Sequence, residues 1–121
     1  MADFLHKDLA DGRWFTLSLI EQMANIGSEV SRAAKWKDKD KNIFKGAFER
    51  ALDLFDLTLE DVRWIGRRFE IARARELFCA AALDADEAKE YKTTLSDLDR
   101  YFYHFAFAVA NKTQAMSSKL Q

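Results

Sequence analysis

The near absence of helix breakers is the feature that most constrains this chain. Its 121 residues contain no proline, and its four glycines (Gly12, Gly27, Gly46 and Gly66) are widely scattered. Glycine and proline are the residues least favourable inside a helix. The sequence therefore predicts an all-α fold.

Apolar periodicity divides the chain into four expected helices. The first runs from about residue 15 to 35, with Met23 and Val30 in its apolar stripe and Gln22 on its opposite, polar face. The second carries the apolar residues between 44 and 55, the third extends from about 58 to 83, and the fourth from about 94 to 117. Their short connections predict an up-down-up-down four-helix bundle. We expect one domain over residues 1–121, with a frayed N-terminus at 1–13.

Two local signals refine the expected helices. Gly27 lies within the apolar stripe of the first helix, which predicts close approach by a neighbouring helix. Thr58 and Thr94 are each followed by acidic residues, as at helix starts. A third helix that begins at Thr58 places a core stripe at Val62, Ile65, Phe69, Ala72 and Cys79, with Trp64, Ile71 and Phe78 offset from it.

The segment 100–110 is apolar on nearly every side of the helix that it is expected to form. Leu98, Phe102, Phe105 and Val109 fit one core stripe. One small core covers only that stripe, so the other faces need a partner. The sequence thus predicts an interface, with another copy of the chain or a different protein, formed by Tyr101, Tyr103, His104 and Phe107.

Charge is unevenly distributed although the net charge is only -1. Residues 32–50 contain seven basic residues and three acids, whereas residues 84–99 contain six acids and two lysines. Residues 63–75 contain five arginines and one glutamate. These arginines predict a surface for an acidic partner or RNA, or for the acidic segment of a neighbouring subunit: Arg63, Arg67, Arg68, Arg73 and Arg75. Arg63 and Arg67 have the i, i+4 spacing of one helix face.

The sequence lacks the residue patterns that most kinds of enzyme active site require. The two histidines, His6 and His104, do not form the Glu-x-x-His pairs of a di-iron bundle, and we expect no metal site. No glycine-rich phosphate loop occurs, and we expect no cofactor. Cys79 is expected to be a buried, unreactive thiol.

Arg100 and His104 are the enzymatic alternative, because they lie one turn apart and could hold and deprotonate an RNA backbone. Their Arg-x3-His spacing is similar to, but shorter than, the Arg-x(4–6)-His signature of HEPN ribonucleases, which are small helical dimers. The resemblance implies a ribonuclease or a toxin-antitoxin component.

Four segments resemble a group of small prokaryotic hypothetical proteins without an assigned activity: residues 17–33 with the following Trp36 and Lys37, residues 47–54, residues 72–76 and residues 101–103. At the level of fold, the chain is also similar to the four-helix bundles of rRNA intervening-sequence proteins and of the accessory variability determinants of diversity-generating retroelements. That similarity implies a ring-like oligomer and, for the second group, support of a reverse transcriptase and RNA.

The sequence as a whole favours a non-enzymatic, self-associating helical accessory or adaptor protein that docks a partner protein or RNA. A single cysteine gives no reason to expect an oxidising compartment, so we expect a cytoplasmic protein. No apolar run has the length of a membrane span, and we expect no membrane partner.

Overall fold

The computed structural model describes residues 12–84 and 93–119, with side chains as far as residue 111. Within these ranges the chain is helical and has no strand, which confirms the all-α prediction. The elements are η1 (Arg13–Thr16), α2 (Leu19–Trp36), α3 (Lys41–Glu60), η2 (Val62–Arg67), α4 (Arg68–Ala82) and α6 (Leu95–Lys119). None of the described helices combines the length and apolar character needed to cross a bilayer.

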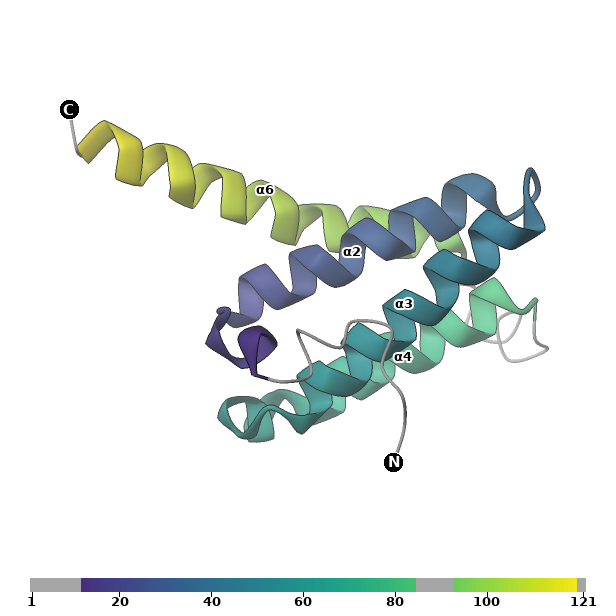
Figure 1. Ribbon diagram of the computed structural model, residues 1–121, viewed down its shortest axis with the longest axis horizontal. Helices are drawn as coiled ribbons and strands as arrows, with labels where there is room; N and C mark the ends of the chain where they lie inside the picture. The colour runs from purple at the N-terminus through teal and green to yellow at the C-terminus, as the bar shows by residue number, and fades with distance from the viewer. Residues whose placement is uncertain (1–11, 85–92, 120–121) are drawn as a thin grey trace.

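Helix α2 lies between α3 and α6 and packs extensively against both (Figure 1). Helix α4 packs against α3, whereas α4 and α6 touch each other only slightly. The C-terminal part of α6 extends past the N-terminal end of α2, away from the other helices (Figure 1). The side of the molecule between α4 and α6 is therefore less closed than the side between α2 and α3.

Side-chain caps fix where the helices begin. Ser18 and Glu21 form a capping box at α2, so α2 starts at Leu19, and residues 13–16 form the separate 3-10 turn η1. At α6, Asp97 N donates to Thr94 Oγ1 and Thr94 N donates to Asp97 Oδ2, which confirms the start signal at Thr94. Of the expected frayed N-terminus, residues 1–11 lie outside the described residues.

The predicted start of the third helix was wrong. Thr58 is fully buried within α3, and its hydroxyl donates to the carbonyl oxygen of Leu54 one turn earlier. The break comes at Asp61, whose side chain accepts from Arg63 N at the start of η2. A buried hydroxyl that bonds its own helix gives the same sequence pattern as a cap.

The predicted core stripe of the third helix was also largely wrong. Val62, Ile65 and Phe69 are 71%, 61% and 86% exposed, whereas Ile71 and Phe78 are buried. Ala72 is exposed and Cys79 is half-buried. The prediction extended one 3.6-residue period through residues 62–67, but η2 is a 3-10 helix with a non-helical residue at Trp64. That change of period rotates α4 away from the expected face.

The contact between α2 and α6 is built around Gly27 and Phe102. A Cβ atom added at Gly27 would lie 2.7 Å from Phe102 Cβ, so only glycine allows this approach. The ring of Phe102 also packs edge-on against Phe55 of α3, with 5.9 Å between ring centroids. The close approach predicted at Gly27 is confirmed.

A cluster of buried polar groups joins η1, α2, α3 and η2. Trp14 Nε1 donates to Thr58 Oγ1 over 3.1 Å. Gln22 Nε2 donates to the carbonyl oxygen of Trp14 and to Asp61 Oδ2, each over 3.0 Å, and Gln22 Oε1 accepts from Trp64 Nε1 over 2.8 Å. Gln22 is fully buried, so its predicted place on the water-facing side was wrong. Its amide bonds groups of η1, of η2 and of Asp61, which separates α3 from η2.

Asp61 carries the negative charge of this cluster and is only 3% exposed. The guanidinium of Arg63 donates to both of its carboxylate oxygens, over 3.0 Å and 2.7 Å, and to the carbonyl oxygen of Leu17. The hydrogen bond from Arg63, with help from Gln22, lowers the pKa of Asp61 to about 2 against the opposing effect of burial. The charge is therefore paired and hydrogen-bonded, as a buried carboxylate requires.

Candidate functional site

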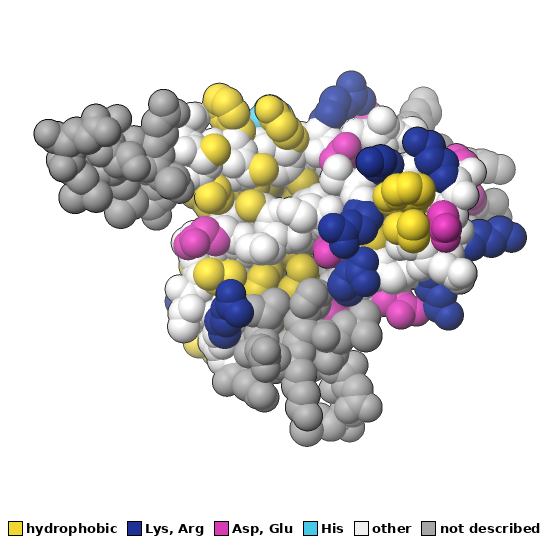
Figure 2. All heavy atoms as spheres, turned by 45° about the horizontal axis from the view of Figure 1, so that its top comes forward, with side chains coloured by type: hydrophobic (Ala, Val, Ile, Leu, Met, Phe, Trp, Pro, Cys, Tyr) yellow, Lys and Arg dark blue, Asp and Glu magenta, His cyan; other side chains and the backbone are white. Residues whose placement is uncertain are grey.

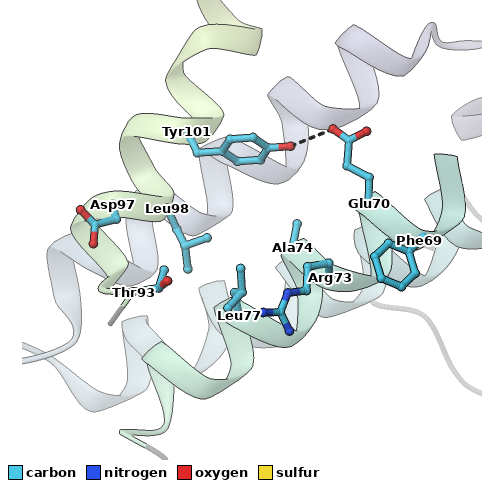
Figure 3. A pocket seen from close by; sticks show the side chains of 9 residues that line it. All are labelled: Phe69, Glu70, Arg73, Ala74, Leu77, Thr93, Asp97, Leu98 and Tyr101. Atoms are coloured by element: carbon cyan, nitrogen blue, oxygen red, sulfur yellow. Dashed lines mark hydrogen bonds between the residues drawn. The ribbon is translucent and has the colours of Figure 1, made fainter. Parts of the chain in front are cut away.

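An open apolar groove lies between α4 and the first turns of α6, with a volume of about 530 Å³. It exists because α4 and α6 both pack inward, on α3 and α2, and leave the space between them unfilled. Its residues are Phe69, Glu70, Arg73, Ala74, Leu77, Thr93, Asp97, Leu98 and Tyr101. Figure 3 shows Leu77 and Leu98 pointing toward one another from α4 and α6. We call this the α4–α6 groove.

Tyr101 and Glu70 bridge the groove near one end (Figure 3). The Tyr101 hydroxyl donates to Glu70 Oε1 over 3.3 Å. Burial, and the neighbouring carboxylate of Glu70, raise the pKa of Tyr101. The phenol therefore stays protonated at neutral pH and keeps this hydrogen bond. Tyr101 also packs against Phe102 and Phe105, so it faces the groove rather than the outside of α6.

The outer face of α6 carries the other predicted interface residues. Tyr103 is 65% and Phe107 is 56% exposed, and their rings stack with 6.4 Å between centroids at an interplanar angle of 27°. His104 is exposed beside them. Hydrophobic side chains gather along the described part of α6 in Figure 2, away from the basic side chains at the opposite end of the molecule. Two large aromatic rings exposed together are characteristic of a binding surface.

Arg100 and His104 both lie exposed on α6, and neither lines the α4–α6 groove. Arg100 donates to Asp97 Oδ1 one turn before it. The pKa of Asp97 is lowered chiefly by hydrogen bonds from Thr94 and also by Arg100, so this carboxylate stays charged opposite the guanidinium. An RNA phosphate would have to displace Asp97 from Arg100. The ribonuclease alternative stays a prediction.

Each of the five arginines predicted to bind an acidic partner or RNA contacts an acceptor in its own chain. Arg63 binds Asp61, Arg67 binds Glu70 over 2.8 Å, and Arg68 donates to the carbonyl oxygen of Leu59. Arg75 binds Asp56 of α3 over 2.9 Å, and Arg73 lies 3.5 Å from Glu76. Since η2 has a 3-10 period, the i, i+4 argument for one face containing Arg63 and Arg67 does not hold.

The basic stretch 32–50 surrounds the turn between α2 and α3. Lys37 binds Asp84 over 2.6 Å, and Arg50 binds Glu29 over 3.2 Å. Lys35 lies over the ring of Trp36, 5.4 Å from its centroid. Of the acidic segment 84–99 that was a predicted partner for arginines, residues 85–92 lie outside the described residues.

The described residues include no cluster of three or more His, Cys, Asp or Glu side chains placed to hold a metal ion. His6 lies outside the described residues. Cys79 is half-buried, and desolvation raises the pKa of its thiol in spite of the nearby Arg75. A protonated thiol is a poor nucleophile.

Sequence reasoning missed Phe69, Leu77 and Glu70 as residues of the groove. Phe69 was predicted in the core, although it follows Arg67 and Arg68 directly in the sequence. The spacing of Ile71, Ala74 and Phe78, at three and four residues, is the signal for the observed face of α4. On that register Phe69 falls outside the buried stripe.

Comparison of this chain with protein families, with curated proteins and with solved structures finds no match. The resemblances to the small prokaryotic proteins, to the ring-forming bundles and to the HEPN ribonucleases therefore stay predictions.

Proposed function

We propose that this chain is a non-enzymatic helical adaptor that associates with further copies of itself through the outer face of α6. The observation that carries the proposal is the pair of stacked rings of Tyr103 and Phe107, both more than half exposed. Tyrosine and phenylalanine are enriched at the centres of interfaces, where their area is removed from water. The extension of α6 past α2 makes this face accessible to a second copy (Figure 1).

The proposal includes an up-down-up-down course of the four helices. Residues 37–40 join α2 to α3, and a single residue, Asp61, separates α3 from η2. Connections this short favour antiparallel neighbours. In an isolated copy one edge of such a bundle, at the outer face of α6, exposes aromatic side chains. A second copy that packs there would bury them.

The double change Tyr103→Glu and Phe107→Glu tests the interface. Light scattering on a sizing column, at low and moderate salt, is expected to show a salt-resistant oligomer for the wild type and a smaller species for this variant. Salt resistance is expected because the contact is apolar.

The matched control is Val62→Glu with Ile65→Glu, which places two carboxylates on another exposed apolar site. It is expected to leave the assembly unchanged. A monomeric wild type, or an unchanged assembly of the Tyr103 and Phe107 variant, would contradict the proposal. Circular dichroism checks that both variants stay helical.

A further inference from the structure

A second apolar surface lies on η2 and α4 and is distinct from the outer face of α6. Val62, Ile65 and Phe69 are 71%, 61% and 86% exposed within eight consecutive residues. Scattered single hydrophobic residues on a surface need no explanation, but several within two turns mark an interaction site. The fold gives these three side chains no internal role, since the core side of α4 is formed by Ile71 and Phe78.

The α4–α6 groove continues this surface. Phe69 belongs to both, and from it the groove runs along α4 toward Leu77, with Leu98 on the opposite wall (Figure 3). A concave, apolar site next to exposed aliphatic side chains is suited to anchoring side chains of a docked helix, which projects them at three and four residue intervals. A flat contact would not use the 530 Å³ of the groove.

Positive charge borders the same surface. Arg63 and Arg75 pair with Asp61 and Asp56 outside it. The charged side chains that remain beside the surface carry a net charge of +1: Arg67, Arg68, Arg73, Glu70 and Glu76. Arg67 and Arg73 form i, i+3 pairs with Glu70 and Glu76, in which every side chain is at least 43% exposed. Exposed pairs of this kind contribute little to stability, so a carboxylate of a partner can replace Glu70 or Glu76 beside these arginines. Arg68 donates to a backbone carbonyl and offers its other donors nearby.

We propose that this surface, formed by Val62, Ile65, Phe69, Arg67, Arg68, Arg73 and the α4–α6 groove, docks an acidic amphipathic helix of a partner protein. The apolar side of that helix fills the groove and covers Val62, Ile65 and Phe69. Its flanking carboxylates bind the arginines, which recognise them with two parallel hydrogen bonds. The partner meets the adaptor on a face that self-association through α6 leaves open.

A nucleic acid fits this surface less well. Of its three exposed apolar side chains only Phe69 offers a ring on which a base can stack, whereas single-strand binding uses rings for successive bases. The carboxylates of Glu70 and Asp97 line the groove and repel any anion inside it, so only the apolar side of the docked helix enters, with its carboxylates outside beside the arginines. A peptide helix can place each of its few charges next to an arginine, whereas a backbone phosphate recurs at every nucleotide.

The test uses the full chain and a fluorescein-labelled synthetic helix of 16 residues, with leucine at every third and fourth position and glutamate on both sides of that stripe. Fluorescence anisotropy is expected to show saturable binding. The same peptide with lysine in place of glutamate, and a single-stranded RNA of 12 nucleotides, are expected to bind at least about tenfold more weakly.

Two variants locate the contact. Phe69→Ala removes an exposed ring and is expected to weaken peptide binding about tenfold without affecting the fold. Arg67→Glu with Arg73→Glu is expected to abolish binding of the acidic peptide. The matched control is Lys39→Glu, in the turn before α3, with Lys41→Glu, at the first residue of α3. Both lysines are exposed, and the pair makes the same change of charge elsewhere. It is expected to bind like the wild type.

The outcomes separate this proposal from self-association. The Tyr103→Glu, Phe107→Glu variant is expected to bind the peptide as well as the wild type, even where its assembly is lost. Two outcomes would overturn the acidic helix as the occupant. One is equal binding of the glutamate and lysine peptides. The other is a wild type that binds the RNA but not the peptide, with the RNA binding lost in the Arg67→Glu, Arg73→Glu variant. Loss of the oligomer in the Val62→Glu, Ile65→Glu control would make a second copy the occupant instead.

Discussion

Two regions of the molecule reverse the usual placement of polar and apolar groups. The first, which we call the closed region, surrounds Gln22 and Asp61. The second, which we call the open region, is the α4–α6 groove. At the first, an amide and a carboxylate are buried and fully bonded. Gln22 donates to the carbonyl oxygen of Trp14 and to Asp61, Trp64 donates to Gln22, and Arg63 donates to Asp61. At the second, apolar side chains line a space that stays open. Buried polar groups that are fully bonded hold one conformation, whereas exposed apolar groups contribute little until something covers them. We therefore assign stability to the first region and binding to the second.

The largest expected effect tests the closed region. Trp14→Ala removes a ring that is 1% exposed, together with the donor to Thr58. It is expected to lower the free energy of unfolding by about 3–5 kcal/mol. This free energy is measured by chemical denaturation, with circular dichroism as the signal.

Trp14→Phe is the matched control, because it keeps most of the ring and loses only the donor. The expected loss is smaller, at about 1–3 kcal/mol, since Thr58 keeps its bond to the carbonyl oxygen of Leu54. A Trp14→Ala variant as stable as the wild type would show that this end is not the stable part of the fold.

The next effect is a fall in the free energy of unfolding at acid pH. The pKa of Asp61 is about 2 in the folded chain, against an ordinary value of 3.8. Because the folded state favours the ionised form, this group stabilises the fold fully above about pH 4, and that contribution is lost as pH falls through about 2. We expect about 2 kcal/mol from this carboxylate, measured as free energy of unfolding along a pH series.

Asp61→Asn separates this group from other carboxylates. The amide keeps the shape of the side chain but does not titrate in this range, so the variant is less stable at neutral pH and changes less between about pH 4 and 2. Parallel curves for the wild type and the variant would mean that Asp61 has the same pKa in the folded and unfolded chain.

Gly27→Ala tests the contact through which α6 joins the closed region. The added methyl group would lie 2.7 Å from Phe102 Cβ, so α6 must shift. We expect a loss of about 1–2 kcal/mol, after the helix preference of alanine offsets part of the clash. Gly46→Ala is the control, since its new methyl group would meet only the flexible end of Arg50, 3.1 Å away. That variant is expected to gain up to about 1 kcal/mol, and a gain at Gly27 as well would refute the close contact.

The smallest effect on stability belongs to the open region. Phe69→Ala is expected to change the free energy of unfolding by less than about 0.5 kcal/mol, because its ring is 86% exposed. Phe78→Ala, in the same helix and fully buried, is expected to cost about 3–5 kcal/mol. Similar losses for the two variants would remove the distinction between the regions.

The sequence was sufficient for the class of fold, for the α6 start at Thr94 and for the tight contact at Gly27. These features depend on local or one-dimensional signals, such as missing prolines, a capping pair and a small residue in an apolar stripe. The outward position of Tyr103 and Phe107 also follows from helical spacing alone, since Leu98 and Phe102 define the buried side.

The face of α4 and the buried role of Gln22 could not be predicted in the same way. The 3-10 segment η2 changes the helical period, and the hydrogen bond between Gln22 and Asp61 joins residues 39 positions apart. A pattern read along one helix contains no information about such partners. The α4–α6 groove is likewise a result of tertiary packing, because it forms where α4 packs on α3 and α6 packs on α2.

Helix α6 is held chiefly by α2, whereas α2 is enclosed by both α3 and α6. A helix with one main neighbour can separate from the rest at a lower free energy than a helix between two. Amide hydrogens of α6 should therefore exchange with solvent faster than those of α2. Partial opening would release α6 as a unit and leave the α2–α3 hairpin intact. The proposed association face thus lies on a helix that opens more readily than α2, and each added copy would slow that opening.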